Sequence, residues 1–374
     1  MAKVKVLIVD DSALVRQMLE KMLSADPFIE VVGTASDPYD AREKVKSLRP
    51  DVLTLDIEMP KMDGVTFLKN LMRLHPLPVV MVSTLTEKGA DITFEALDLG
   101  AVDFVTKPKL NLENTFDAYA LEIRRKVKIA AKVSREQLER QYERYLENKE
   151  NNPRINQSLA LKHPIQEKLS ADAVVPLKPV PKNFTKTDQI VALGASTGGT
   201  EAIKEVLMRL PENAPAMVIS QHIPAAFSLP FAKRMDSLSA MTVVEAEDKQ
   251  VIQQGWVYIA PGDKHLLIEK SGSKYICRLN DGPLVNRHKP SVDVMFRSVM
   301  QTVGTNAIGV LLTGMGADGA QGLKELREIG AHTIAQDEKT SIVWGMPGEA
   351  TKIGAAEEVL PLQKISEKIL NWVK

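Results

Sequence analysis

Short apolar runs alternate with helical patterns over the first 107 residues of the chain. The runs lie at residues 4–9, 31–34, 52–55, 79–82 and 103–105, and each has the length of a buried parallel strand. Between the first two runs, apolar side chains recur at a spacing that keeps one helical face apolar: Leu14, Met18, Leu19, Met22 and Leu23. Repeated strand and helix units of this kind predict a doubly wound parallel sheet.

A second strand and helix pattern begins at Gln189. Strands are expected at residues 190–193, 216–220, near 243, 307–312 and 332–335, and helices include residues 292–303 and 319–329. Residues 255–279 have the pattern of short antiparallel strands with glycine-containing turns. The second half therefore predicts another α/β domain.

The two patterns are separated by a charged and proline-rich segment. Beyond residue 111 we expect one long charged helix that reaches about residue 150, with Leu138, Tyr142 and Tyr145 at helical spacing. Residues 151–187 contain several prolines and no sustained periodicity, which is typical of a flexible linker. We therefore divide the chain into a first domain at 1–120, a helical and flexible linker at 121–187 and a second domain at 188–374.

Composition narrows the class of protein. The chain has 374 residues with 48 basic and 48 acidic side chains, so no excess charge draws the whole molecule to nucleic acid or an anionic membrane. Its single cysteine, Cys277, excludes an internal disulfide framework. The first apolar run stops at Asp10, and no stretch approaches the ~20 apolar residues of a membrane span. We expect a cytoplasmic protein with no nucleic-acid partner and no direct membrane insertion.

Polar side chains follow the ends of the predicted strands in the first domain. Asp10 and Asp11 end the first strand and Asp56 ends the third, while Ser83 and Lys107 follow the fourth and fifth. Ligands bind at the carboxyl ends of parallel strands, so these groups are expected to meet. Crowded carboxylates favour Mg²⁺, and the lysine and the hydroxyl suit the oxygens of a phosphoryl group transferred to a nucleophilic aspartate. A single strand-end aspartate is more often a turn or cap residue. The whole set at these strand ends instead predicts a site for phosphoryl transfer.

These residues lie in segments that resemble the receiver domain of bacterial response regulators, over residues 3–120. The matching segments are Val-Asp-Asp-Ser at 9–12, Asp-Ile-Glu-Met-Pro-Lys-Met-Asp-Gly at 56–64, Val-Ser at 82–83 and Phe-Val-Thr-Lys-Pro at 104–108. The resemblance implies a flavodoxin-like fold and a histidine kinase as phosphodonor.

The resemblance also implies a role for each residue of the site. Asp56 would accept the phosphoryl group and, with Asp10 and Asp11, would hold Mg²⁺. Lys107 and Ser83 would bind the phosphoryl oxygens, with Ser83 rather than Thr84 at the hydroxyl position. Phe104 would be the switch aromatic. The implied set is therefore Asp10, Asp11, Asp56, Ser83, Phe104 and Lys107.

A glycine-rich turn follows the first predicted strand of the second domain. Residues 194–199, Gly-Ala-Ser-Thr-Gly-Gly, lie between a strand and a helix, as a G-x-S-x-G nucleophile turn requires. The same turn also suits a phosphate or a dinucleotide at the helix N-terminus. A dinucleotide site expects an acidic residue about 20 positions on, whereas the next strand is followed by Gln221 and His222. A histidine at this position can act as a general base, whereas a dinucleotide site needs an acidic residue to bind the ribose. The sequence therefore favours the nucleophile turn.

The third strand-end segment is a glycine-rich turn at residues 312–319. It offers Asp318 and closely spaced backbone N–H groups. Ser196, His222 and Asp318 would all lie just past strand ends, where a histidine can take the proton of a serine and an aspartate can orient the imidazole. The chain order Ser, His, Asp differs from the Ser, Asp, His order of α/β-hydrolases, so the chain is not in that fold family.

The other histidines have less to offer. His75, His163, His265 and His332 lie in loop, linker, hairpin or strand contexts and are predicted to be structural. His288, in the segment Arg-His-Lys-Pro-Ser-Val-Asp at 287–293, is open to two interpretations, a structural residue or one that lines a substrate cleft.

These motifs resemble the catalytic domain of the chemotaxis protein-glutamate methylesterases, the CheB family. The resemblance covers residues 188–374 and rests on segments 194–200, 221–224, 288–296 and 312–318. It implies a Rossmann-like fold, a triad of Ser196, His222 and Asp318, and an oxyanion hole to which a backbone N–H near Met315 contributes; Thr197 is a further candidate for the oxyanion hole or the substrate site. The connector at 110–187 is long and charged for the family.

The family implies a phosphorylation-activated enzyme of chemotactic adaptation. It would hydrolyse glutamate methyl esters on chemoreceptors, releasing methanol, and would deamidate receptor glutamines, with Mg²⁺ at the receiver and no cofactor at the esterase site. Two rival classes stay open on the residues alone: a response regulator whose output domain binds DNA, and one whose output domain binds a nucleotide. The first lacks a basic excess or a recognisable helix-turn-helix, and the second lacks the acidic partner.

Overall fold

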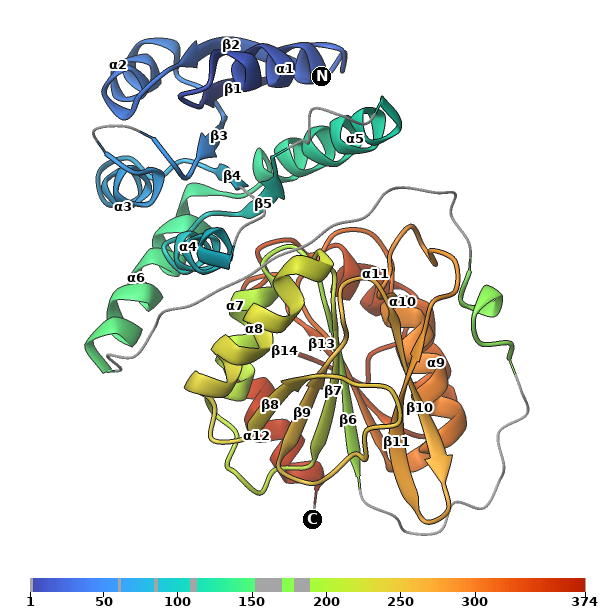
Figure 1. Ribbon diagram of the computed structural model, residues 1–374. Helices are drawn as coiled ribbons and strands as arrows, with labels where there is room; N and C mark the ends of the chain where they lie inside the picture. The colour runs from blue at the N-terminus through green and yellow to red at the C-terminus, as the bar shows by residue number, and fades with distance from the viewer. Residues whose placement is uncertain are drawn as a thin grey trace. The chain divides into compact units, whose positions relative to one another are not determined.

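The computed structural model describes residues 3–59, 62–83, 87–107, 113–151, 170–177 and 189–373. The backbone separates into two compact units (Figure 1). The described residues up to 151 belong to the first unit and those from 170 onward belong to the second. Among the described residues, no helix is both long enough and apolar enough to cross a lipid bilayer.

The first unit is built on a parallel sheet of five strands in the order β2-β1-β3-β4-β5. The strands are β1 (Val4–Val9), β2 (Ile29–Ala35), β3 (Val52–Asp56), β4 (Val79–Ser83) and β5 (Asp103–Thr106). The helices between them are α1 (Ala13–Ser24), α2 (Pro38–Leu48), α3 (Gly64–Leu74) and α4 (Glu87–Asp98). The predicted doubly wound sheet is confirmed. The strand order changes direction between β1 and β3, so the crevice at their carboxyl ends is the expected ligand site.

The single long helix expected after residue 111 is wrong. The structure has two helices, α5 (Glu113–Ala130) and α6 (Arg135–Asn151). The break follows from a reciprocal cap: Ser134 N–H donates to Gln137 Oε1 (2.8 Å), and Gln137 N–H donates to Ser134 Oγ (3.3 Å). Helix α6 then packs on α3 and α4, with Leu138 buried.

The second unit contains a parallel sheet of seven strands in the order β14-β13-β12-β6-β7-β9-β8. The strands are β6 (Ile190–Ala195), β7 (Ala216–Gln221), β8 (Thr242–Glu245), β9 (Trp256–Ile259), β12 (Ala307–Leu311), β13 (His332–Gln336) and β14 (Glu358–Leu360). Chain order leaves β6 toward β7 on one side and toward β12 on the other. The crevice between β6 and β12 is therefore the expected ligand site of this sheet.

Helices cover both faces of this sheet (Figure 1). One group is α7 (Gly199–Leu207), α8 (Ala225–Leu238) and α12 (Leu362–Trp372), and the other is α9 (Val292–Thr302), α10 (Ala320–Glu328) and α11 (Met346–Lys352). Helix α9 is the most deeply buried, with every residue from 292 to 300 inaccessible to solvent or nearly so. Its apolar side chains pack with both the sheet and α10, which fixes the start of α9 beside the crevice.

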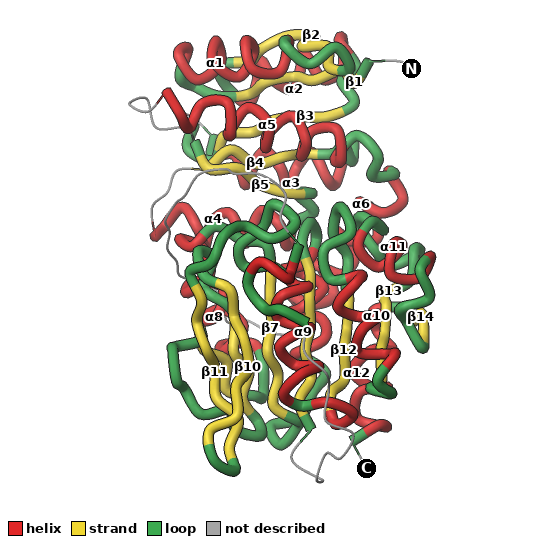
Figure 2. The backbone as a smooth tube through the Cα atoms, turned by 90° about the vertical axis from the view of Figure 1, so that its right-hand side faces the viewer, coloured by secondary structure: helices red, strands yellow, loops and turns green. Residues whose placement is uncertain are grey.

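Three features of the second unit differ from the sequence expectation. The predicted run of antiparallel strands contains β9, which pairs in parallel with β7 and β8. Only β10 (His265–Ser271) and β11 (Lys274–Asn280) form an antiparallel hairpin, which packs along α9 (Figure 2). The elements α11, β14 and α12 were not expected. Within the predicted linker, the short helix η1 (Ala171–Ala173) packs on α9.

Candidate active site and phosphoacceptor site

The nucleophile turn follows β6 as expected. Ser196 is nearly buried, and its backbone is held on both sides: its N–H donates to Thr313 O (3.0 Å) and its carbonyl accepts from Gly199 N–H (2.7 Å). Gly198, with φ of 74°, makes the left-handed turn into α7. A Cβ on Gly314 would lie 2.7 Å from Ser196 Cβ, so only glycine allows the third strand-end turn to approach the serine this closely.

His222 follows the neighbouring strand, β7. Its N–H donates to Ala195 O (3.2 Å), directly before the nucleophile. The buried Gln221 side chain joins the two turns, because its Nε2 donates to Ser196 O (2.9 Å) and to His222 O (3.3 Å). Backbone and side-chain hydrogen bonds therefore fix the histidine beside the serine.

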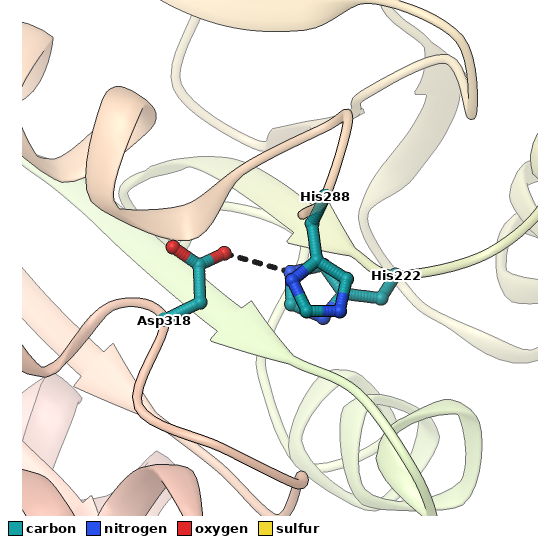
Figure 3. A group of neighbouring side chains, drawn as sticks. All are labelled: His222, His288 and Asp318. Carbon is teal, nitrogen blue, oxygen red and sulfur yellow. Dashed lines mark hydrogen bonds and ion pairs between the residues drawn. The ribbon is translucent and has the colours of Figure 1, made fainter. Parts of the chain in front are cut away.

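Asp318 orients the histidine ring (Figure 3). The Nε2–H of His222 donates to Asp318 Oδ2 at 2.8 Å, and Val292 N–H donates to the same oxygen at 2.8 Å. The other oxygen accepts from Ser291 Oγ (2.8 Å) and Asn286 Nδ2 (2.8 Å). With its proton on Nε2, the ring has its lone pair on Nδ1, which is buried and has no hydrogen-bond partner among the described residues. Nδ1 is therefore the atom that can act as a base.

A second buried carboxyl lies beside Asp318. Asn286 Nδ2 bridges the pair, because it also donates to Asp293 Oδ2 (2.7 Å). Burial, and then the neighbouring charge of Asp318, raises the pKa of Asp293 to about 8. Burial alone would raise the pKa of Asp318 too, but the hydrogen bond and charge of His222 lower it below its ordinary value. The opposite shifts favour the negative charge on Asp318, the carboxyl that faces the histidine.

His288 lies against the His222 ring. The two ring centroids are 3.7 Å apart and the ring planes differ by 3°. His222, His288 and Asp318 each offer one atom that could bind a metal ion, and these three atoms lie within 4.8 Å of one another. A metal ion binds in the plane of an imidazole, about 2.0–2.1 Å from its nitrogen. Two stacked parallel planes share no such point, so the pair does not suit a common ion.

Two backbone N–H groups near the predicted oxyanion hole already donate to carbonyl oxygens, which leaves fewer candidate donors for an oxyanion. The N–H of Ser196 is used by Thr313 O, and that of Gly314 donates to Val343 O (3.0 Å). Thr197 and Met315 stay the predicted donors.

Gln221, Ser291 and Asp293 lie in segments on which the family resemblance rested, but the sequence assigned them no individual role, and Asn286 was not singled out. Ser291 had a usable signal, since it is the N-cap of α9 and its Oγ accepts from Val294 N–H. Asn286 had none, because it lies in a short turn, at a φ of 52°, outside any periodic pattern.

The acidic cluster of the first unit forms at the switch point between β1 and β3. Carboxylate oxygens of Asp10, Asp11 and Asp56 lie within 4.8 Å of one another, and Asp10 and Asp56 are buried. Lys107 Nζ lies 2.7 Å from Asp56 Oδ2 and 3.2 Å from Asp10 Oδ2. The predicted convergence of these four side chains is observed.

The electrostatics of this cluster fit a hard cation. Burial, and then the charge of Asp10, raises the pKa of Asp56 to about 6, although Lys107 opposes the shift. Asp56 Oδ1 is buried without a hydrogen-bond partner among the described residues. An oxygen-rich site with an unsatisfied buried carboxylate oxygen matches the ligands that Mg²⁺ prefers.

The last two predicted residues of this site lie at its edge. Ser83, at the end of β4, is buried, and its Oγ accepts from Thr93 Oγ1 (2.8 Å). Phe104 on β5 is buried, with Lys126 Nζ 5.1 Å from the ring centroid. Thr84, the rejected alternative to Ser83, lies outside the described residues. The phosphoryl-binding and switch roles stay predictions.

Comparison with known proteins connects the two sites. The family models described as response regulator receiver domain and CheB methylesterase match residues 6–117 and 191–369. A relative from Hydrogenovibrio crunogenus, named protein-glutamate methylesterase/protein-glutamine glutaminase, is 72% identical over 376 residues and covers 100% of both chains. The chain belongs to the CheB family. The match at 191–369 removes the support for a DNA-binding or nucleotide-binding output domain.

A second full-length relative and one solved catalytic domain are also similar to this chain. A protein-glutamate methylesterase/protein-glutamine glutaminase of Xanthomonas campestris is 52% identical over 370 residues, covering 98% of this chain and 96% of the relative. The crystal structure of the Thermotoga maritima CheB methylesterase catalytic domain is 38% identical, covering 50% of this chain and 100% of that chain with a TM-score of 0.49. Receiver domains in general bind Mg²⁺ for phosphorylation, which agrees with the acidic cluster.

Proposed function

We propose that this chain hydrolyses glutamate methyl esters on chemoreceptors, releasing methanol, and that Ser196, His222 and Asp318 carry out the reaction. The observation that carries the proposal is the His222–Asp318 hydrogen bond of 2.8 Å beside the nucleophile turn. The same acyl-transfer chemistry on a glutamine side chain is deamidation, and both activities appear in the names of the relatives.

The geometry supports a two-step reaction. Ser196 Oγ attacks the ester carbonyl as His222 Nδ1 takes its proton, and Asp318 stabilises the imidazolium. The proton then leaves with methanol, forming an acyl-serine. Water attacks that ester, gives a proton to His222 and releases the glutamate carboxylate and the serine. Backbone N–H groups at Thr197 and Met315 are proposed to hold the oxyanion. In this scheme His222 supplies the base, so no step requires a metal or a cofactor.

We also propose that Asp56 is the phosphoacceptor, with a chemotaxis histidine kinase as donor. Asp10, Asp11 and Asp56 would hold Mg²⁺, which shields the negative charge of an incoming phosphoryl group. Ser83 and Lys107 would bind its oxygens, and Phe104 would respond to them: the proposed set is Asp10, Asp11, Asp56, Ser83, Phe104 and Lys107. Support comes from the Lys107–Asp56 contact of 2.7 Å and from the buried, unsatisfied Asp56 Oδ1.

Each of the two proposed sites is assigned to its own domain. We propose a receiver domain at 1–120, a connecting segment at 121–187 and a catalytic domain at 188–374. The packing of α6 on α3 and α4 indicates that the first part of the connecting segment is a helical extension of the receiver. Both the kinase donor and the methylated receptor helices place the proposed reaction in the cytoplasm.

Serine-directed labelling tests the catalytic assignment. A fluorophosphonate should modify the whole chain at Ser196, identified by peptide mass spectrometry, and Ser196→Ala should lose the label. Ser237→Ala is the matched control, because Ser237 Oγ is a hydrogen-bonded helix hydroxyl (2.8 Å to Arg234 O) and its loss should leave labelling unchanged. Label that persists in Ser196→Ala would contradict the proposal.

A further inference from the structure

His222 and His288 come from separate segments of the second unit and meet face to face. His222 follows β7, whereas His288 lies in the loop between β11 and α9. Their rings are 3.7 Å apart at an angle of 3° (Figure 3). The edge of the His222 ring is also held, because its Nε2–H donates to Asp318 Oδ2. His288 therefore covers a face of the ring whose edge is held by Asp318.

The loop holds His288 firmly. Val285 N–H donates to His288 O (3.1 Å) and His288 N–H donates to Val285 O (2.8 Å), closing a tight two-residue turn. Asn286 and Arg287, the two central residues, have φ of 52° and 69°, as a type I′ turn requires. Val285 is fully buried in a cluster with Leu267. The ring of His288 is thus presented from a rigid turn.

Further contacts tie this turn to the catalytic residues. Asn286 Nδ2 donates to Asp318 Oδ1 (2.8 Å). On the other side, the buried His265 joins the two ends of the loop, since its Nε2 donates to Pro283 O (2.9 Å) and its Nδ1 accepts from Ser291 N–H (3.1 Å). One short segment therefore contacts both the aspartate and the histidine of the triad.

We propose that His288 is a positioning residue of the esterase, and that it acts by stacking on His222; this inference rests on the proposed triad. The stack keeps the ring of His222 in the plane in which Nε2 bonds to Asp318 and Nδ1 stays available as the base. It is also stronger when His222 is charged, because an aromatic face attracts a cation. In the proposed reaction His222 gains a positive charge when it takes the serine proton, so the stack stabilises that step.

The competing role for His288 is the one that its sequence context suggested, a wall of the substrate cleft. A cleft residue contributes to substrate binding and changes KM, whereas a residue that holds the base changes kcat. The two roles also differ in what replaces the histidine. A stack needs a flat ring and no hydrogen-bonding nitrogen, so phenylalanine should substitute for it.

The test is steady-state methyl ester hydrolysis by the whole chain with three substitutions. We expect His288→Ala to lower kcat about 10- to 30-fold with KM within about twofold, and His288→Phe to keep kcat within about threefold of the original chain. His288→Gln keeps volume without a ring and should behave as His288→Ala, which covers the case in which the alanine variant does not fold. His332→Ala is the matched control, because His332 also stacks on an aromatic ring, that of Trp372 (4.3 Å), outside the proposed site, and should leave kcat unchanged.

A spectroscopic measurement separates positioning from general disorder. The low-field proton resonance of His222 Nε2–H, assigned by its loss in His222→Ala, should persist in His288→Phe and broaden in His288→Ala. The inference is overturned if His288→Ala raises KM with unchanged kcat, or if His288→Phe is as slow as His288→Ala. Full activity of His222→Ala would instead overturn the triad itself.

Discussion

At the scale of single residues, the pKa values of two neighbouring aspartates of the second unit are shifted in opposite directions. Asp318 accepts hydrogen bonds from His222, Asn286 and Ser291, and its pKa is lowered. Asp293 accepts from Gly322 N–H (2.7 Å) and Asn286, and burial raises its pKa to about 8. Environments that push two carboxyl pKa values apart are typical of catalytic sites. The side-chain amide of Asn286 donates a hydrogen bond to each carboxyl and so lets the two groups lie side by side.

Substitution of Asn286 tests this bridge. Asn286→Gly keeps the left-handed backbone and removes the side chain, and should cost about 1.5–3 kcal/mol of unfolding free energy, the value of a hydrogen bond to a charged group. Asn286→Asp should cost more, because it replaces the shared donor with a third carboxyl. Urea unfolding followed by tryptophan fluorescence reports on the second unit, which contains all three tryptophans, Trp256, Trp344 and Trp372. An aspartate variant as stable as the glycine variant at pH 7 would contradict the bridging role.

The raised pKa of Asp293 predicts a pH dependence of stability. Between its ordinary pKa of 3.8 and about 8, the unfolded chain loses a proton that the native chain retains. The stabilisation is therefore complete below about pH 4 and is lost as the pH rises toward 8. Relative to Asp293→Asn, which does not titrate, the unfolding free energy of the original chain should fall by up to about 1.4 kcal/mol per pH unit. A difference between the two chains that stays constant from pH 5 to 8 would show that Asp293 is ionised in the native protein.

The residues found from sequence are those that follow strands. Ser196, His222 and Asp318 were predictable because each lies just past a recognisable apolar run, and parallel strands bring such positions together. Asn286 and His288 reach the same place through a tight turn between a hairpin and a helix. No periodic pattern encodes where such a turn points, so the sequence left the role of His288 open and gave no signal for Asn286.

At the scale of elements, both parallel sheets place their chemistry where the strand order changes direction. The strands β1, β3, β6 and β12 are buried along most or all of their length, and they were predicted within one or two residues. The three-residue β14 was too short to give a pattern. The break between α5 and α6 was visible in principle, as the Ser-x-x-Gln sequence at 134–137, but mixed charge on both sides hid it.

Arg297 on α9 forms one ion pair with Asp172 in η1 and another with Glu325 on α10, and the two pairs should contribute unequally to stability. Arg297 is buried and makes two hydrogen bonds to Glu325, which is also buried, and one of 2.7 Å to Asp172, whose side chain is 62% exposed. Glu325→Gln should cost roughly 3–5 kcal/mol of unfolding free energy because it leaves a buried charge without its main partner. Asp172→Asn should cost less than about 1 kcal/mol. The same fluorescence-detected unfolding measures both, and equal costs would mean that the buried pair is not the stronger contact.

At the scale of the whole molecule, the proposed phosphoacceptor site lies in one compact unit and the proposed triad lies in the other. The three residues of the proposed triad, Ser196, His222 and Asp318, all lie in the second unit. We expect phosphorylation to act by uncovering the esterase site. The fragment 188–374 should then hydrolyse methyl esters without a phosphodonor, and faster than the unphosphorylated whole chain. A folded fragment slower than the resting chain would indicate that the receiver helps to build or present the substrate site.

The most direct test of the coupling between the two sites is the release of labelled methanol from methylated receptor membranes, measured with and without a small-molecule phosphodonor. The original chain should release methanol in both conditions and faster with the phosphodonor. Asp56→Asn should keep the basal rate without the stimulation, because an amide cannot form an acyl phosphate, and Ser196→Ala should release almost none in either condition. Stimulation that survives in Asp56→Asn, or methanol release that survives in Ser196→Ala, would contradict the account.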